Sequence, residues 1–420
     1  MNILLHQATL VHPNSKELHL KKRDILIKNG RIEKIASKIE LPNNTEKISL
    51  KNLHVSLGWF DASVSFGEPG FEERETLENG VRTAALSGFT DILLNTNTHP
   101  IPDKSTSIGF LKNIAKSYSN TNVHLLGALT IESKGEALAD LYDMFEKGAL
   151  AFSDYKKTIT NANLLKIALQ YSQSFDGLIY SYPQNREVAH KGVAHEGIQS
   201  TLLGLKGIPS LSEHLQIQRD LHLLEYSGGR LHIPTISTKE SVKLIAAAKK
   251  KGLNVSCSVA LHNLWGTDVL LNDFDTNVNL RPPLRTQEDQ KELQKGLLDG
   301  TIDSVVSDHN PIDIELKNVE FDNATPGSIG LEASFGVLNS IFGMEKAVEL
   351  LSSGRSIYNI PSPSFDEGAM ASLSLFNPDF EYEFSNSDIK SSSSNCMYLG
   401  NQLKGKSYGS INNNSILLND

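Results

Sequence analysis

Three aspartates, Asp61, Asp154 and Asp308, are the side chains with the clearest chemical potential, and each lies in or directly after a short apolar run. Asp61 opens the pattern Asp61-Ala-Ser-Val-Ser65, in which polar and apolar positions alternate. Zinc sites are built from histidine nitrogen, cysteine thiolate and carboxylate, so two serine hydroxyls cannot supply ligands. Aspartates without imidazoles make a poor zinc site. We therefore expect these carboxylates to be the polar groups of a pocket, with no metal bound and no other cofactor.

The elements that must position these aspartates lie in residues 56–360, where short apolar segments alternate with amphipathic ones. Residues 236–251 repeat Val242, Ile245 and Ala248 at helix spacing. Repeated β-then-α units predict a parallel sheet with right-handed crossovers, and about eight of them make a barrel of about 250 residues with its chemistry at the strand ends. An open doubly wound sheet is the alternative, but no Gly-x-Gly-x-x-Gly follows the first strand. The predicted strands are 91–94, 123–127, 177–180, 231–233, 253–259 and 304–307.

Both ends of the chain have a different pattern, typical of β structure. Two alternating runs meet at Asn29-Gly30, a strong hairpin signal, and residues 371–376 have the pattern of a strand. We therefore predict an α/β protein with two domains. Residues 56–360 form a TIM-like (β/α)8 barrel, and residues 1–55 and 361–420 together form a small β-sandwich.

Composition excludes several classes of protein. A hydrophobic content of 39% and a charged content of 21% are ordinary for a globular chain, and the net charge of -9 argues against nucleic-acid binding. No segment approaches the roughly 18–20 apolar residues of a membrane span, and the first residues are too polar for a signal peptide. Cys257 and Cys396 fit no zinc or redox spacing. We expect a cytoplasmic protein in a reducing compartment.

Residues 57–70 resemble the first strand end of dihydroorotases and related cyclic amidohydrolases, in which Asp-x-His-x-His is followed by Phe-Arg-Glu-Pro-Gly. Gly58, Phe60, Asp61 and the segment Glu68-Pro-Gly70 keep that frame. The resemblance runs over nearly the whole chain. The chain is similar to class I dihydroorotases, and this resemblance implies an amidohydrolase barrel. Its other specific segments are 208–213, Arg219-Asp220, 282–285, 300–303, 307–311 and 326–332.

In active members of that family, a binuclear zinc centre activates a water that attacks a ring amide, and an aspartate shuttles the proton. The resemblance places the four ligand histidines at Ser63, Ser65, Tyr182 and Thr235. Only carboxylates remain. Asp154 matches a bridging ligand of one subgroup, and Asp308 matches the proton shuttle, a vestigial catalytic residue here unless the protein is active.

The substrate-binding positions are also altered. The arginine that would pair with a substrate carboxylate is Gly67, and a distal histidine is Ile312, whereas Asn97 matches the family's Asn-Thr-x-Pro and is the candidate substrate-binding residue, with a turn or cap role as the alternative. His99, His262 and His309 are expected to be structural, with the ring donating to a backbone carbonyl. His190 and His195 are expected to be solvated.

Three functions remain open. The first is a catalytically inactive dihydroorotase-like protein of pyrimidine biosynthesis, serving as a structural or regulatory partner of aspartate transcarbamoylase. The second is an active dihydroorotase, or another cyclic amidohydrolase, that binds zinc at an atypical site. The third is a small-molecule sensor that reuses the pocket at the strand ends. A homodimer is the default expectation for assembly.

Overall fold

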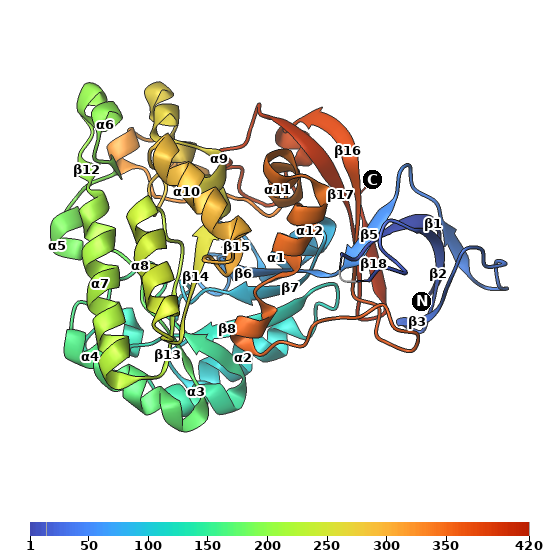
Figure 1. Ribbon diagram of the computed structural model, residues 1–420, viewed down its shortest axis with the longest axis horizontal. Helices are drawn as coiled ribbons and strands as arrows, with labels where there is room; N and C mark the ends of the chain where they lie inside the picture. The colour runs from blue at the N-terminus through green and yellow to red at the C-terminus, as the bar shows by residue number, and fades with distance from the viewer. Residues whose placement is uncertain (14, 420) are drawn as a thin grey trace.

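Eight parallel strands form a nearly closed barrel in the computed structural model, which describes residues 1–13 and 15–419 (Figure 1). Each strand pairs in parallel with the next along the chain, and an isolated parallel bridge between Val64 and His309 links the last segment back to the first. The predicted barrel is confirmed, and a doubly wound sheet is excluded because the strand order never reverses. The strands are β6 (Trp59–Val64), β7 (Phe89–Leu94), β8 (Asn122–Gly127), β9 (Ala149–Phe152), β10 (Leu178–Tyr180), β13 (Arg230–Ile233), β14 (Val255–Ala260) and β15 (Ser304–Val306).

Helices surround the barrel and bury one apolar face each. In α8 (Lys239–Lys250), Val242, Ile245 and Ala248 are buried, and the Thr238 hydroxyl accepts a hydrogen bond from the Ser241 N–H at the helix start. None of the described helices is both long and apolar enough to cross a membrane. The other outer helices are α1 (Leu77–Leu86), α2 (Ser105–Ala115), α3 (Leu141–Lys147), α4 (Ala162–Ser172), α7 (Ser210–Ser227), α10 (Gln287–Leu298), α11 (Ser334–Phe342) and α12 (Met344–Ser352).

Shorter elements lie in the loops at the mouth of the barrel, the end where the strands finish. Between β10 and β13 the chain forms two short helices and a two-stranded parallel sheet, and one more short helix follows β14. These elements are α5 (Arg186–Ala189), β11 (Ala194–His195), α6 (Ile198–Leu203), β12 (Gly207–Ile208) and α9 (Leu261–Trp265).

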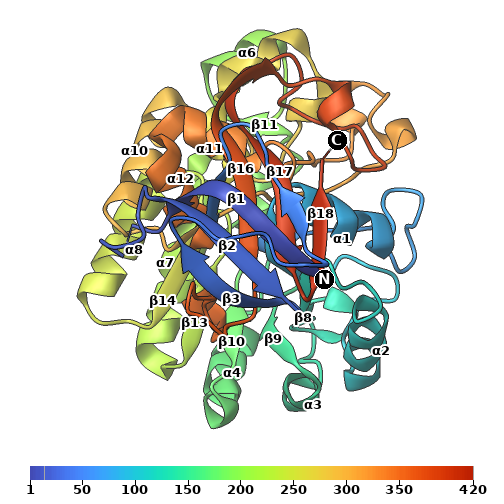
Figure 2. The same ribbon diagram turned by 90° about the vertical axis from the view of Figure 1, so that its right-hand side faces the viewer.

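The two ends of the chain meet in one mixed sheet beside the barrel, which Figure 2 shows facing the viewer. Its order is β18-β17-β16-β5-β1-β2-β3, with β4 paired to β1, so the N-terminal and C-terminal strands join where β5 pairs with β16. Asn29 and Gly30 both have positive φ in the β2–β3 hairpin, as its turn requires. The limits of the two domains stay a prediction. The strands are β1 (Asn2–Val11), β2 (Lys22–Lys28), β3 (Arg31–Ala36), β4 (Glu46–Ile48), β5 (His54–Leu57), β16 (Leu373–Glu383), β17 (Gln402–Asn412) and β18 (Ser415–Leu418).

The junction between sheet and barrel is built around Gly58 and Trp59. A Cβ on Gly58 would lie 2.1 Å from the Thr90 hydroxyl oxygen, so a larger residue cannot fit between the two layers. The fully buried Trp59 ring stacks on Phe335 at a centroid distance of 5.1 Å and contacts Phe376 of β16 at 5.5 Å. Aromatic packing of this kind adds stability beyond area burial, so it fixes the sheet against the barrel.

A buried ion pair lies at the start of β7. Arg355 donates to Asp91, with 2.8 Å between Nη2 and Oδ2, and His124 Nε2 lies 3.0 Å from Asp91 Oδ1. Burial alone would raise the pKa of Asp91, but hydrogen bonding from His124 and the charge of Arg355 outweigh it and lower that pKa. Asp91 therefore stays ionised inside the protein only because its partners are in place.

Replacing Arg355 with Met is expected to lower the free energy of unfolding by about 3–5 kcal/mol at neutral pH, because it leaves a buried carboxylate unpaired. Urea denaturation measures this loss. Lys346→Met is the control, because Lys346 pairs with the exposed Glu349 and such a pair contributes about 0–1 kcal/mol. Equal losses in the two variants would contradict the assignment.

Candidate functional site

The carboxyl ends of the barrel strands surround a small cavity, which we call the inner cavity. Its free volume is about 20 Å³, close to the space that one water molecule needs. Four of the positions singled out from the sequence line it, namely Ser63, Tyr182, Thr235 and Asp308. Its full lining is Ala62, Ser63, Asn95, Ser153, Tyr155, Lys156, Tyr180, Tyr182, His232, Pro234, Thr235, Ser258 and Asp308.

Asp308 follows β15 and forms an ion pair with Lys156, which follows β9. Lys156 Nζ lies 2.6 Å from Asp308 Oδ2, and the Ser63 hydroxyl donates to Asp308 Oδ1 at 3.3 Å. Burial opposes the charge on Lys156, but the negative charge of Asp308 outweighs it and raises the pKa of the ammonium. Burial raises the pKa of Asp308, and Lys156 opposes that rise. The ammonium is thus the counter-ion of the cavity's carboxylate.

Asp61 in β6 lies buried below this pair and is held by backbone donors. Its two oxygens accept from the N–H of Ser63 at 3.0 Å and the N–H of Ser307 at 3.1 Å. Burial raises the pKa of Asp61 to about 7, and the nearby charge of Asp308 adds to that rise. Asp61 consequently fixes the end of β6 against the segment that carries Asp308.

Asp154 does not line the inner cavity with Asp308. One of its oxygens accepts from the backbone N–H groups of Leu129 and Thr130, at 3.0 and 2.9 Å, and the other accepts from the Thr130 hydroxyl. Burial raises the pKa of Asp154, and these hydrogen bonds oppose the rise. It lines two larger cavities outside the inner one. The sequence made Asp154 a polar pocket candidate, but it did not indicate that Asp154 and Asp308 line different cavities.

The two serines of the first strand end are bound into an amide network. The Asn95 amide donates to the hydroxyls of Ser63 at 3.2 Å and Ser65 at 3.1 Å, and the Ser65 hydroxyl donates to Asn97 Oδ1 at 3.0 Å. Each hydroxyl therefore has protein partners. Asn97 also lines one of the outer cavities, and its role toward a substrate stays a prediction.

Tyr182 and Thr235 follow the neighbouring strands β10 and β13 and line the inner cavity. Tyr182 is buried, and burial raises the pKa of its hydroxyl. Thr235 has φ of +47°, and its N–H donates to the Ser258 hydroxyl at 3.1 Å. A β-branched residue in the left-handed region is strained, and such strain concentrates at functional sites. Asp308 has φ of +51°, so two strand ends keep an unusual backbone toward the cavity.

Gly67 and Ile312, the positions at which the family resemblance expects substrate-binding residues, have little space around them. A Cβ on Gly67 would lie 1.6 Å from the Phe71 carbonyl oxygen, so this turn has no room for any side chain, including arginine. Ile312 is 2% exposed, and its N–H donates to the Asn395 side chain at 3.0 Å. The C-terminal segment therefore covers Ile312.

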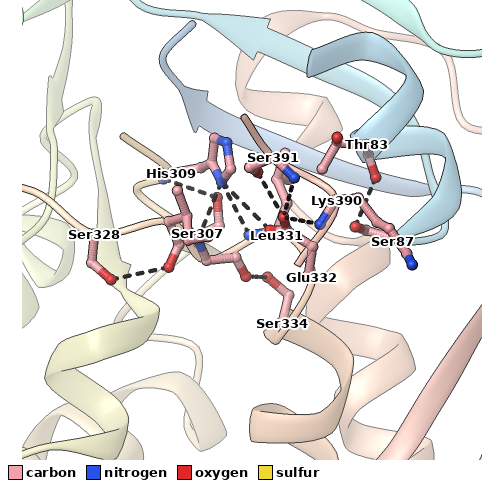
Figure 3. A network of polar contacts seen from close by, with 12 residues as sticks. Thr83, Ser87, Ser307, His309, Ser328, Leu331, Glu332, Ser334, Lys390 and Ser391 are labelled. Carbon is pink, nitrogen blue, oxygen red and sulfur yellow. Dashed lines mark hydrogen bonds and ion pairs between the residues drawn. The ribbon is translucent and has the colours of Figure 1, made fainter. Parts of the chain in front are cut away.

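Buried histidines near the site differ from the sequence prediction. His309 is fully buried, but its Nδ1 accepts from the N–H groups of Gly330 and Leu331, so the expectation that the ring donates to a carbonyl is wrong (Figure 3). Because burial favours the neutral ring, the pKa of His309 falls to about 4. The neighbouring Glu332 accepts from the backbone and hydroxyl of Ser391, which ties the barrel to the C-terminal segment.

The other histidines divide between buried and exposed positions. His262 Nε2 has Asp308 Oδ2 at 3.8 Å and no hydrogen-bond partner among the described residues. His99 and His190 are exposed. The expectation that His195 is solvated is wrong, because its Nδ1 lies 3.0 Å from the buried Arg285 guanidinium. The sequence around His195, a loop flanked by glycines, did not indicate that Arg285 packs against it.

Several residues of the site could not be identified from the sequence. They are Lys156, Asn95 and His232, whose Nδ1 lies 2.8 Å from the Ser256 hydroxyl. Burial lowers the pKa of His232 to about 3. Asn95 had a positional signal, since it directly follows the predicted strand 91–94, whereas Lys156 follows β9, which is not among the predicted strands. Within residues 1–13 and 15–419, no three His, Cys, Asp or Glu side chains come together as a group that could hold a metal ion.

The barrel with its attached mixed sheet defines the class of protein as an amidohydrolase-type α/β fold. The structure of the L-hydantoinase (dihydropyrimidinase) from Arthrobacter aurescens matches with a TM-score of 0.85 at 20% identity, over 99% of this chain and 96% of that chain. A D-hydantoinase matches with a TM-score of 0.79 at 19% identity, over 100% of this chain and 96% of that chain. At such low identity these likenesses show the fold alone.

Sequence comparison identifies the family. The family model described as "Dihydro-orotase-like" matches residues 54–241. A dihydroorotase from Pelotomaculum thermopropionicum is 34% identical, over 100% of this chain and 99% of the relative. A dihydroorotase from Caldicellulosiruptor saccharolyticus is 37% identical over the same shares of the two chains. The chain therefore belongs to the dihydroorotase family.

Replacing Lys156 with Met is expected to make stability depend on pH. Without the ammonium the pKa of buried Asp308 rises further above its unfolded value of about 3.9, so the folded state prefers the protonated acid. Stability is then present at low pH and lost as pH rises toward the folded pKa. Urea denaturation at pH 5 and pH 8 should show the larger loss, about 3–5 kcal/mol, at pH 8.

The double variant Lys156→Met/Asp308→Asn is the matched control for this prediction, because it removes the carboxylate that loses its partner. It should lack the added pH dependence. A single variant that loses equal stability at both pH values would show that Lys156 is not the counter-ion of Asp308.

Proposed function

We propose that this member of the dihydroorotase family belongs to pyrimidine biosynthesis, does not itself catalyse zinc-dependent ring hydrolysis, and serves as a structural or regulatory partner of aspartate transcarbamoylase. The observation that carries the proposal is the ion pair of Lys156 and Asp308 in the inner cavity. An ammonium there supplies the positive charge that a metal would supply in an active relative.

The donors around the inner cavity do not fit a zinc centre. The positions that the family resemblance gives to four imidazoles carry the hydroxyls of Ser63, Ser65, Tyr182 and Thr235, which are not ligands of structural or catalytic zinc. Asp61 and Asp308 are already bound by backbone N–H groups and by the ammonium. A divalent cation beside Asp308 would also be repelled by the charged Lys156.

The substrate side supports the same proposal. Recognition of a carboxylate is strongest with a bidentate guanidinium, and the turn at Gly67 has no room for one. The second polar position of the resemblance is the buried Ile312. Without a guanidinium and an imidazole at these two positions, the protein would not orient a dihydroorotate ring, and orientation is a large part of catalysis.

An active dihydroorotase is the second candidate, and the names and full-length coverage of the curated relatives favour it over the first. Asp61, Asp308 and Asn97 remain at positions that an active site would use. Activity would require Asp308 to shuttle a proton and therefore to release Lys156. Overall similarity reports ancestry, whereas function is decided by the side chains of the site.

The decisive experiment measures zinc content and dihydroorotate ring opening on one purified, zinc-supplemented sample. We expect zinc far below one ion per chain and turnover at the solvent background. Asp308→Asn is the control for any residual rate. Activity that this variant abolishes would establish the second candidate, whereas activity that it leaves unchanged would come from a contaminating enzyme.

The partnership is tested by co-expression with the aspartate transcarbamoylase of the same organism, followed by size-exclusion chromatography. A structural or regulatory subunit is expected to co-elute with the transcarbamoylase at a stoichiometric ratio. Each protein run alone is the control. Separate elution at concentrations well above those of the cell would contradict the proposed partnership. It would not bear on whether the inner cavity binds zinc.

A further inference from the structure

A second and larger cavity lies at the mouth of the barrel, outside the inner cavity. It has a volume of about 410 Å³, within the range of small-molecule pockets. Five basic side chains line it, and we call it the basic groove after them: Lys134, Lys156, Lys157, Arg186 and Arg281. A neighbouring cavity of about 380 Å³ shares Lys156 and Lys157 with it and extends it toward His99.

The basic residues reach the groove from separate loops of the barrel. Lys134 follows β8, Lys156 and Lys157 follow β9, Arg186 begins α5 after β10, and Arg281 comes from the long segment after β14. Functional residues of such barrels come from the loops at the strand ends. Since sequence-distant segments supply these charges, the groove differs from a chance run of surface lysines.

The positive charge of the groove is only partly neutralised within the protein. Lys134 pairs with Glu132 and Lys156 pairs with Asp308. By contrast, Lys157, Arg186 and Arg281 form no ion pair among the described residues. Like charges collected in this way repel one another, so a bound anion would relieve a cost that the free protein carries.

Several of the other polar groups of the groove are already hydrogen-bonded within the protein. Arg281 uses Nη2 to donate to the Gly192 carbonyl at 2.8 Å, which holds the half-buried guanidinium in place. The one carboxylate in the lining, Asp154, already accepts from two backbone N–H groups and from Thr130. The Thr158 hydroxyl already donates to the Gln184 carbonyl, whereas the side-chain amide of Gln184 adds a neutral donor.

We infer that the basic groove binds a small molecule that carries a diphosphate or polyphosphate group. Such a group concentrates several negative charges and many acceptor oxygens in one compact unit, which three uncompensated cations can surround. Arginine and lysine are the usual partners of phosphate, arginine through its fork and lysine as a point charge. The net charge of -9 makes this positive groove a local departure from the rest of the chain. The inference goes beyond the proposed function and does not depend on it.

The groove also contacts the inner cavity through one residue. Lys156 lines both cavities, and its ammonium binds Asp308. An anion in the groove would therefore lie close to the counter-ion of Asp308. Binding itself is tested without any change to Lys156, which keeps the test separate from the role of the ion pair.

The test is isothermal titration of the whole protein with inorganic pyrophosphate, compared with the double variant Lys157→Gln/Arg186→Gln. Both side chains are exposed and unpaired, so the variant should fold. The control is Arg82→Gln/Lys250→Gln, which removes two exposed, unpaired charges from α1 and α8. We expect saturable binding that is weakened at least about tenfold by the groove variant and unchanged in the control, because the variant removes two charged contacts to the anion.

Each other outcome overturns the inference in a different way. Absence of saturable heat with pyrophosphate would mean that the groove is not a polyphosphate site. Equal weakening in the groove variant and the control would indicate diffuse attraction. Citrate is the comparison for carboxylates, and binding as tight as that of pyrophosphate would exclude phosphate selectivity. None of these results depends on zinc content or ring hydrolysis, so a failure here leaves the proposed function unaffected.

Discussion

Each buried carboxylate at the barrel mouth needs a positive charge or hydrogen-bond donors beside it. The arrangement of the rest of the site follows from which of these partners each carboxylate has. Moving an ionised carboxylate out of water costs several kcal/mol unless it is paired or hydrogen-bonded. Asp308 obtains the ammonium of Lys156, Asp61 obtains two backbone N–H groups, and Asp154 obtains the backbone and hydroxyl of the loop after β8. Three aspartates that could share one centre are thereby held by three separate sets of protein groups.

Many of the polar groups around these carboxylates are hydrogen-bonded within the protein, although His262 Nε2 beside Asp308 has no partner among the described residues. The hydroxyls of Ser63 and Ser65 are bound by Asn95, and the inner cavity retains space for about one water. The hydrogen bonds that are formed hold these side chains in place. Thr235 and Asp308 both have positive φ, a strained conformation that a β-branched residue such as Thr235 rarely adopts. The geometry of a functional strand end is therefore kept while its donors differ from those of a metal centre.

Positive charge at the mouth is divided between two tasks. Lys156 neutralises the buried Asp308, whereas Lys157 and Arg186 form no ion pair among the described residues. Loss of Lys156 would leave a buried carboxylate unpaired, whereas the cations without partners are the ones that a bound anion would neutralise. Lys156 and Lys157 are adjacent in the chain, yet only Lys156 has a carboxylate partner. Fold similarity to hydantoinases gives no information on either, because both depend on individual side chains.

The sequence alone determined the barrel, the strands contributed by both termini and the positions at which the family resemblance expects ligands. These features depend on local periodicity and on short motifs, such as the helix spacing of Val242 and Ile245 and the Asn29-Gly30 turn. Only the tertiary structure decided which groups meet. Lys156 and Asp308 are 152 residues apart, and no periodicity relates them. Contacts of this kind depend on loop conformation and desolvation, which a chain's local pattern does not encode.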